Sequence, residues 1–278
     1  MVAESSFLWV SVFFILQMKI SLIHSASSDS LMLHVLASEI GDCFRYLSTD
    51  ESCRSIVFSG IGKHFSAGID LTDFMQNIAG SMAKKSDVGR RAFLAEAIVK
   101  KFQDDITALE LCNKPVIAAI HNGCIGAGLN LVTACDVRYC SSDAWFQLKE
   151  VDIGIAADVG VLQRMPRIVA NDSFMREISY TARKVTSDEA LKEGLVSRVL
   201  VDKESTMNEA VKLAETIAAK SPVAVQGTKR ALVYARDHSV QQSLDQVRTW
   251  NLSMLQSDDV GKAAQANMTK SGAEFDDV

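Results

Sequence analysis

The sequence predicts an α/β fold, in which buried strands alternate with amphipathic helices. Short apolar runs at 55–60, 115–120 and 137–140 have the length of buried strands. Apolar side chains recur at helical spacing in the longer segments of the chain, as an alternation of helices and strands requires. A glycine-bearing stretch follows each of the first two runs, which is typical of a turn after a strand.

The elements of this alternation can be assigned in order along the chain. Strands are placed on short apolar runs, and helices on segments with helical apolar spacing or with a terminating glycine. The segment 72–91 is polar and interrupted by glycines, so it receives no element. In chain order we predict a helix at 31–47, a strand at 55–60, a helix at 92–112, a strand at 115–120, a glycine-rich turn and helix at 121–136, a strand at 137–140, and a helix and strand at 188–200.

The two ends of the chain differ from this core. The apolar run at 7–16 resembles part of a signal peptide, but it is shorter than the ~20 residues that a membrane-spanning helix needs. Beyond residue 203, amphipathic patterns at 204–219, 222–236 and 239–270 predict helices. We therefore divide the chain into an atypical N-terminal segment (1–30), targeting-like or from a mispredicted exon, a core (31–203) and a C-terminal helical region (204–278).

Composition excludes several classes of protein. The chain has 278 residues, 48% of them hydrophobic, which suits one large globular domain or a core with an appendage. Its net charge of -5 does not supply the basic surface that nucleic-acid binding needs. The six cysteines form no C-x-x-C pair, so we interpret them as reduced thiols and expect no metal site.

Two glycine-bearing loops carry the first candidate chemistry: "SGIGKHFSAGIDL" at 59–71 and "NGCIGAGLN" at 122–130. If they face each other, one backbone N–H from each can bind a carbonyl oxygen and stabilise it as an enolate. Taken separately, each loop is explained more simply by turn and packing glycines. Neither has the G-x-G-x-x-G spacing of a dinucleotide site, and the chain has no G-x-S-x-G or H-E-x-x-H motif.

Three acids in the largely apolar stretch "LKEVDIGIAADVG" (148–160) raise a second question. A buried carboxylate is costly unless it is paired or used in chemistry. Glu150 and Asp158 are therefore either partners of arginines or acid/base groups whose pKa burial raises toward working pH. Asp152 is expected to be a solvated or capping acid.

From about residue 33 to its end, the sequence resembles the crotonase (enoyl-CoA hydratase/isomerase) superfamily. The resemblance rests on "HFSAGIDL" (64–71), "KPVIAAIHNGCIGAGLNLVTACDVRYC" (114–140) and "FQLKEVDIGIAADVGVLQRMPRIV" (146–169). Within the superfamily it is most similar to the dienoyl-CoA isomerases, because Asp158 stands where hydratases typically have a small or apolar residue. The resemblance implies a crotonase (ClpP-like) spiral of β-β-α units with a C-terminal helical trimerisation region.

The resemblance also implies roles for individual residues. The backbone N–H groups of Ile69 and Ala127 correspond to the oxyanion hole, and Glu150 and Asp158 to the proton-transfer acids. The remaining substrate-binding positions are Ser66, Ala67, Gly68, Asp70, Gly126 and Gly128.

Two departures from the family stand out. The family has a third acid where this chain has Asn130, which can orient Glu150 by a hydrogen bond but cannot carry a proton. Hydratases use glutamates at both of these positions, so Asn130 disfavours hydration. Residues 1–30 show neither the opening strand nor the loop that touches coenzyme A in the family, and loss of that strand would expose a sheet edge.

The resemblance implies isomerisation of 3,5-dienoyl-CoA to 2,4-dienoyl-CoA in fatty-acid β-oxidation, through a thioester enolate. The alternatives are a Δ(3),Δ(2)-enoyl-CoA isomerase that relies on Glu150 alone, or a catalytically weak scaffold that binds acyl-CoA. Coenzyme A would be part of the substrate, and no other cofactor is expected. The implied assembly is a homotrimer or a dimer of trimers without membrane insertion, in the mitochondrial matrix or the peroxisome.

Overall fold

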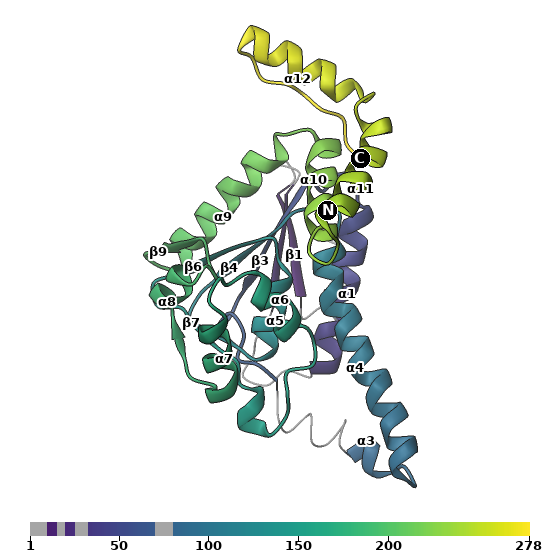
Figure 1. Cartoon of the computed structure of the whole chain (residues 1–278). Helices are drawn as coiled ribbons and strands as arrows, with labels where there is room; N and C mark the ends of the chain where they lie inside the picture. The colour runs from purple at the N-terminus through teal and green to yellow at the C-terminus, as the bar shows by residue number, and fades with distance from the viewer. Residues whose placement is uncertain (1–9, 16–19, 26–32, 70–79) are drawn as a thin grey trace.

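The computed structural model describes residues 10–15, 20–25, 33–69 and 80–278 (Figure 1). A six-stranded sheet forms the centre of the molecule. All its neighbouring strands are parallel except the first two, which form an antiparallel pair. In sheet order the strands are β1 (Val10–Ile15), β2 (Ile20–Ser25), β3 (Ser55–Gly60), β4 (Val116–Ile120), β6 (Val137–Ser141) and β9 (Arg198–Leu200).

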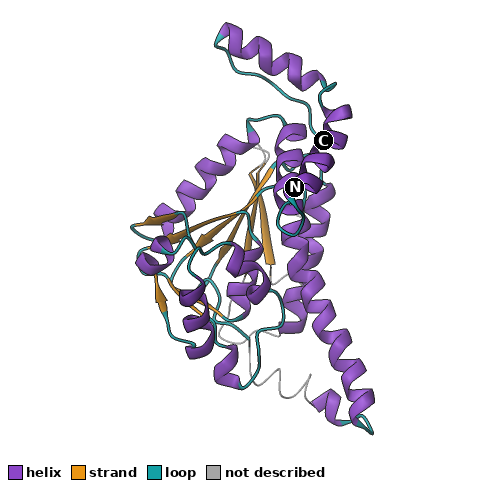
Figure 2. Ribbon diagram, viewed as in Figure 1, coloured by secondary structure: helices purple, strands orange, loops and turns teal. Residues whose placement is uncertain are grey.

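Helices cover both faces of this sheet (Figure 2). Side chains alternate along each strand, so Phe58 of β3 faces one core while its neighbour Val57 faces the other. The first core is closed by α1 (Leu33–Thr49), α4 (Val88–Leu111) and α5 (Ala127–Ala134). The second core is closed by α9 (Lys203–Ala218), whose buried Ala210 and Ala214 let the helix lie close to the strands.

A second, smaller sheet includes part of the second glycine-bearing loop. It contains β5 (Gly123–Ile125), β7 (Trp145–Gln147) and β8 (Val185–Thr186), in that order. These strands are two or three residues long, which is too short for a pattern of hydrophobicity to reveal, so they were not predicted. The elements after β7 include the 3₁₀ segment η2 (Glu150–Ile153) and the helices α6 (Val161–Arg164), α7 (Asp172–Thr181) and α8 (Ser187–Lys192).

The predicted alternation of helices and strands is confirmed. The strand predicted at 55–60 is found with those bounds, and those at 115–120 and 137–140 differ by one residue at one end. Helix α4 begins four residues before the predicted position 92. Asp87 caps it there, since its side chain accepts a hydrogen bond from the Arg90 N–H at 2.9 Å.

The prediction that residues 1–30 lack an opening strand is wrong. Strands β1 and β2 form a hairpin, and β2 continues in parallel pairing with β3. The apolar run at 7–16 therefore overlaps an edge strand, and β2 covers the edge of β3 that we expected to be exposed. Within the described residues, no helix is long and apolar enough to cross a membrane.

The C-terminal region is helical, as predicted. The pattern at 239–270 contains two helices, because Ser257 caps a new helix after a break. The region comprises α9, α10 (Pro222–Tyr234), α11 (Val240–Met254) and α12 (Asp258–Thr269), of which α12 projects from the body (Figure 1). The division at residue 203 stays a prediction, since α9 packs on the sheet.

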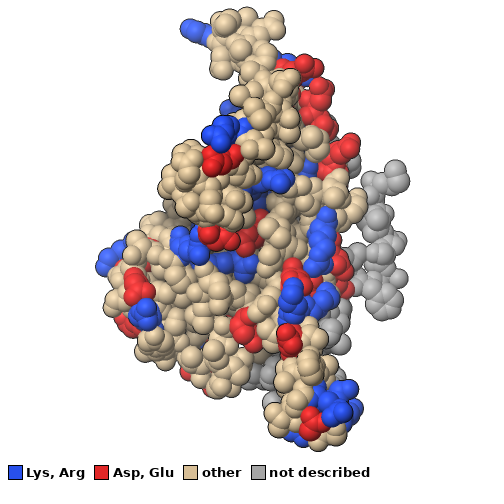
Figure 3. All heavy atoms as spheres, turned by 45° about the vertical axis from the view of Figure 1, so that its right-hand side comes forward, with Lys and Arg blue, Asp and Glu red and all other residues tan. Residues whose placement is uncertain are grey.

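The end of the chain returns to the core. Arg54 is buried and forms an ion pair with Asp277 at 2.8 Å, and Lys114 donates to the Val278 carbonyl at 2.8 Å. On the face shown in Figure 3, acidic and basic side chains are interspersed over the surface. The six cysteines are free thiols, and five of them are buried.

Candidate active site

The two glycine-bearing loops lie face to face. Ser66 pairs with Cys124 in an isolated parallel bridge. The Ser66 N–H donates to the Gly123 carbonyl at 3.0 Å, and the Ile125 N–H donates to the Ser66 carbonyl at 3.1 Å. The two loops, far apart in the chain, are therefore joined by backbone hydrogen bonds and face each other, as an oxyanion hole formed from both would require.

Glycine is required at two positions of this junction. A side chain at Gly128 would place its Cβ 2.6 Å from the Ser66 Cβ, so only glycine lets α5 approach the first loop. Gly126 precedes α5 with φ 50° and ψ -111°, a conformation that other residues rarely adopt. This turn makes the Ala127 N–H the first of helix α5, where it has no partner within the helix.

The proposed oxyanion donors lie beside a cavity of about 420 Å³. Ile69 and Ala127 both line it, and within the described residues neither N–H donates to a protein acceptor. Ala67, Gly68 and Gly126 line the same cavity. Ser66 instead holds the loop, where its hydroxyl accepts a hydrogen bond from the Gly68 N–H at 3.3 Å. Asp70 lies outside the described residues.

Glu150 lies at the start of η2, on the wall of this cavity. It is partly buried, and burial raises the pKa of its carboxyl above the usual glutamate value. Its Oε1 accepts a hydrogen bond from Asn130, while its Oε2 is buried and has no partner among the described residues. A carboxylate in this state is suited to accept a proton from a substrate.

Asn130 is fully buried and connects three parts of the site. Its Nδ2 donates to Glu150 Oε1 and to the Gly126 carbonyl, both at 3.2 Å. Its Oδ1 accepts a hydrogen bond from the Val161 N–H at 2.7 Å, which fixes the orientation of the amide. The expected hydrogen bond from Asn130 to Glu150 is confirmed, and the same side chain also holds the glycine turn.

Asp158 lines the same cavity, but its environment differs from the expected one. We expected both acids to be buried, and for Asp158 this is wrong because the residue is exposed. Its charge still contributes to the raised pKa of Glu150. Among the described residues neither acid forms an ion pair with an arginine, so the pairing alternative is not supported. Asp152 is exposed and pairs with Lys149 at 2.7 Å, as expected for a solvated acid.

Two features of the site were missed by the sequence analysis. The wall of the cavity includes the α4 side chains of Ala95, Ile98, Val99 and Phe102, whose spacing is that of one helix face. This apolar stripe was visible in the sequence, but nothing there showed which element it faces. His64 connects the loops, because its Nδ1 accepts a hydrogen bond from the Gly123 N–H at 3.2 Å.

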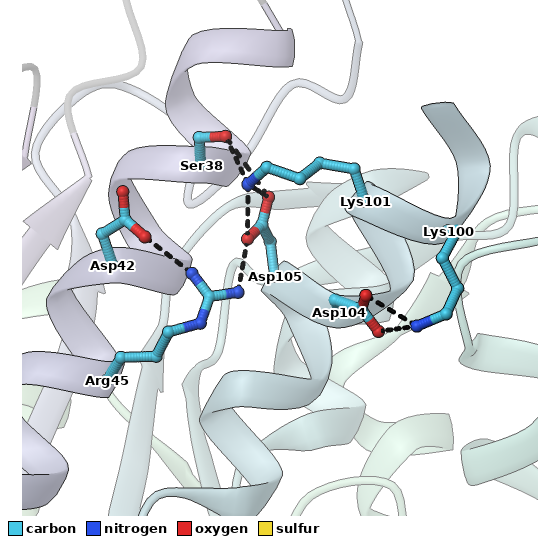
Figure 4. Close-up of polar contacts among 7 residues, drawn as sticks. All are labelled: Ser38, Asp42, Arg45, Lys100, Lys101, Asp104 and Asp105. Carbon is cyan, nitrogen blue, oxygen red and sulfur yellow. Dashed lines mark hydrogen bonds and ion pairs between the residues drawn. The ribbon is translucent and has the colours of Figure 1, made fainter. Parts of the chain in front are cut away.

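An ion-pair cluster around the buried Asp105 holds α4 against α1 (Figure 4). Asp105 is 1% exposed, and its carboxylate forms ion pairs with Arg45 Nη2 at 2.6 Å and with Lys101 Nζ at 2.7 Å. A Cβ at Gly41 would lie 2.6 Å from Asp105 Oδ1, so the two helices are in close contact there. The cluster fixes the rotation of α4 about its axis, and with it the stripe that lines the cavity.

The chain is similar to known proteins over most of its length. The family model described as enoyl-CoA hydratase/isomerase matches residues 18–277. The chain is 52% identical over 232 residues to the mitochondrial Δ(3,5)-Δ(2,4)-dienoyl-CoA isomerase of Rattus norvegicus, covering 84% of this chain and 70% of that protein. It is 48% identical over 220 residues to the peroxisomal Δ(3,5)-Δ(2,4)-dienoyl-CoA isomerase of Arabidopsis thaliana, covering 79% of this chain and 78% of that one.

Solved structures confirm the predicted fold class. A crystal structure of a putative enoyl-CoA hydratase from Streptomyces coelicolor superposes with a TM-score of 0.84. It covers 99% of this chain and 96% of that one at 21% sequence identity, a likeness that concerns the fold.

Proposed function

The chain belongs to the enoyl-CoA hydratase/isomerase family, and we propose that it converts 3,5-dienoyl-CoA to 2,4-dienoyl-CoA in fatty-acid β-oxidation. One observation carries this proposal. Two acids, Glu150 and Asp158, line one apolar-walled cavity together with the backbone donors of Ile69 and Ala127. An isomerisation that moves a proton between distant carbons of one chain needs such a pair.

In the proposed mechanism, the thioester oxygen accepts hydrogen bonds from the Ile69 and Ala127 N–H groups. One acid removes a proton from carbon two, and the electrons of that C–H bond move into the conjugated system as an enolate, stabilised by about 2.7–4 kcal/mol per backbone donor. The other acid donates a proton to carbon six, and the double bonds shift to positions two and four. No electron leaves the substrate, so the reaction needs no redox cofactor, and coenzyme A enters as part of the substrate.

Asn130 has a positioning role in this mechanism. An amide carries no proton between substrate atoms, but it can hold Glu150 and the oxyanion turn at Gly126 in a fixed relation. Hydration of an enoyl-CoA, which in this family uses glutamates at both positions, is disfavoured by the same residue.

A Δ(3),Δ(2)-enoyl-CoA isomerase that relies on Glu150 alone is the second candidate. It is favoured by the contrast between Glu150, held by Asn130, and the exposed Asp158. The scaffold alternative predicts acyl-CoA binding without turnover. One experiment separates the three: incubation with 3,5-dienoyl-CoA and with 3-enoyl-CoA, following the ultraviolet band of the conjugated 2,4-dienoyl product and the formation of 2-enoyl-CoA.

We further propose that the chain assembles as a homotrimer, or as a dimer of trimers, through its C-terminal helices. These helices border a groove of about 730 Å³ and expose large apolar side chains that water disfavours. They include Leu232, Leu244, Leu252, Leu255 and Val260.

Since the named relatives are mitochondrial or peroxisomal, we place this chain in one of these two compartments.

A further inference from the structure

Helix α4 is hydrogen-bonded to the segment that carries Asp158. The Nε2 of Gln103, on α4, donates to the backbone carbonyl of Asp158 at 2.7 Å. The two ends of this segment are fixed from the site itself, since the Ile155 N–H donates to the Glu150 carbonyl at 3.2 Å and the Val161 N–H donates to Asn130 at 2.7 Å. Between those ends, the side chain of Gln103 holds the backbone from another element. This is what the hydrogen bonds of the described residues show.

The helix that supplies this hydrogen bond is itself firmly placed. Asp105, two positions after Gln103, is the buried centre of the ion-pair cluster with Arg45 and Lys101 (Figure 4). Phe102, the residue before Gln103, lines the cavity of about 420 Å³, here called the acyl cavity because the proposed function places the acyl chain in it. One turn of α4 therefore touches the α1 cluster, the acyl cavity and the Asp158 backbone at once.

Asp158 lacks the direct support that Glu150 has. It is exposed, and it borders both the acyl cavity and a second hollow of about 550 Å³ that Gln103 and Gln163 also line. Two of the three arginines that line this hollow are engaged elsewhere, since Arg164 pairs with Glu110 at 2.8 Å and Arg236 pairs with the same carboxylate. Among the described residues, the third, Arg167, forms no ion pair with Asp158. The direction of the Asp158 carboxylate thus depends on its backbone, which Gln103 holds.

We propose that Gln103 is a positioning residue for the reaction, which sets where the Asp158 carboxylate stands along the acyl chain. The inference rests on the proposed two-acid function. It assigns to α4 a second task besides forming the wall of the cavity. Because a displacement of about 1 Å can cost up to ~10²-fold in rate, loss of one hydrogen bond to the Asp158 backbone is expected to matter for turnover.

The test is Gln103→Leu, which keeps the approximate size and removes the donor. We expect kcat on 3,5-dienoyl-CoA to fall about tenfold, with KM changed less than about twofold and any 3-enoyl turnover unchanged. Gln163→Leu is the matched control, because Gln163 is an exposed glutamine at the same hollow whose side chain has no bond to Asp158. Thermal melting of both variants should match the wild type, since both residues are exposed.

A double variant completes the test. Adding Gln103→Leu to Asp158→Asn should cause no further loss, because the first change acts through the second residue. An equal loss on both substrates, full additivity with Asp158→Asn, or a wild-type rate in Gln103→Leu would overturn the inference. If Asp158→Asn itself leaves 3,5-dienoyl turnover intact, or if the wild type has none, the proposed function fails and the inference falls with it.

Discussion

The two acids of the site are held in opposite ways. Glu150 is partly buried, and its carboxylate is fixed from inside the molecule by the amide of Asn130. Asp158 is exposed, and its backbone is held from outside by Gln103 of α4. The part of the cavity around Glu150, here called the Glu150 end, depends on α5 and the core. The part around Asp158, the Asp158 end, depends on the position of the long surface helix α4. The two ends should therefore respond differently to mutation.

The difference also concerns charge. Burial disfavours the ionised form of Glu150 and raises its pKa, so this acid is poised to hold a proton at a higher pH than usual. Such a group is costly to the fold and useful to the reaction, a combination typical of catalytic residues. Asp158, by contrast, is exposed to solvent.

The largest expected effect is that of Glu150→Gln. Removal of the acid/base group should lower 3,5-dienoyl turnover by roughly 10²–10⁴-fold, while acyl-CoA affinity, which rests on backbone donors and the apolar wall, should stay within a few-fold. Steady-state kinetics and a binding titration measure the two quantities. Turnover at the wild-type rate would remove Glu150 from the mechanism.

The same substitution should lower activity but raise the stability of the fold at neutral pH. The pKa of Glu150 is raised in the folded state, so the folded protein binds the proton more tightly than the unfolded chain does. The resulting loss of stability appears as pH rises above the ordinary glutamate value, and it is complete above the raised value. Glu150→Gln should therefore be more stable than the wild type at neutral pH and lose this advantage in acid, as denaturant titrations at several pH values would show.

Asp158→Asn should have the next largest effect, and it should depend on the substrate. We expect 3,5-dienoyl turnover to fall about 10–100-fold and any 3-enoyl turnover to change much less, because a short proton shift does not need an acid at the far end of the chain. The ratio of the two rates is the quantity to measure. Equal losses on both substrates would favour the one-acid isomerase.

The support of α4 can be tested through stability. Asp105→Ala should destabilise the fold by about 2–3 kcal/mol, below the usual 3–5 for a broken buried pair, because Arg45 and Lys101 are about half exposed and can be hydrated. Asp104→Ala is the control, since its pair with Lys100 is exposed and should contribute less than about 1 kcal/mol (Figure 4). Equal losses in urea unfolding would show that the cluster does not fix the helix.

Asn130→Asp should produce the smallest effect, seen mainly in the pH profile. The new carboxylate would face Glu150 Oε1 and the Gly126 carbonyl without a donor, so the apparent pKa of the acid pair should rise. We expect a basic shift of the pH–rate profile, with turnover several-fold higher at neutral pH because a partly protonated pair holds an acid and a base ready. An unchanged profile would argue that Asn130 does not act on Glu150.

Much of the Glu150 end could be predicted from the sequence. The strands before the two glycine loops follow from short apolar runs, and the resemblance to the family implied the hydrogen bond from Asn130 to Glu150. The oxyanion positions stay a prediction. The Asp158 end could not. The bond from Gln103 joins residues far apart in the chain, and burial of Asp158 was inferred from apolar neighbours that do not cover it. The strands at 10–15 and 20–25 were hidden by an apolar run with the appearance of a targeting segment.

The central claim, that two separately placed acids act in one turnover, is tested most directly by exchange in D₂O. Each acid alone can complete only one half of the reaction, either removal of a proton from carbon two or delivery of a proton to carbon six. We predict that one of the two variants, Glu150→Gln or Asp158→Asn, exchanges the carbon-two protons of 3,5-dienoyl-CoA for deuterium much faster than it forms product, and that the double variant does neither. Loss of exchange and product together in both single variants, or product formation at the wild-type rate in either, would contradict the account.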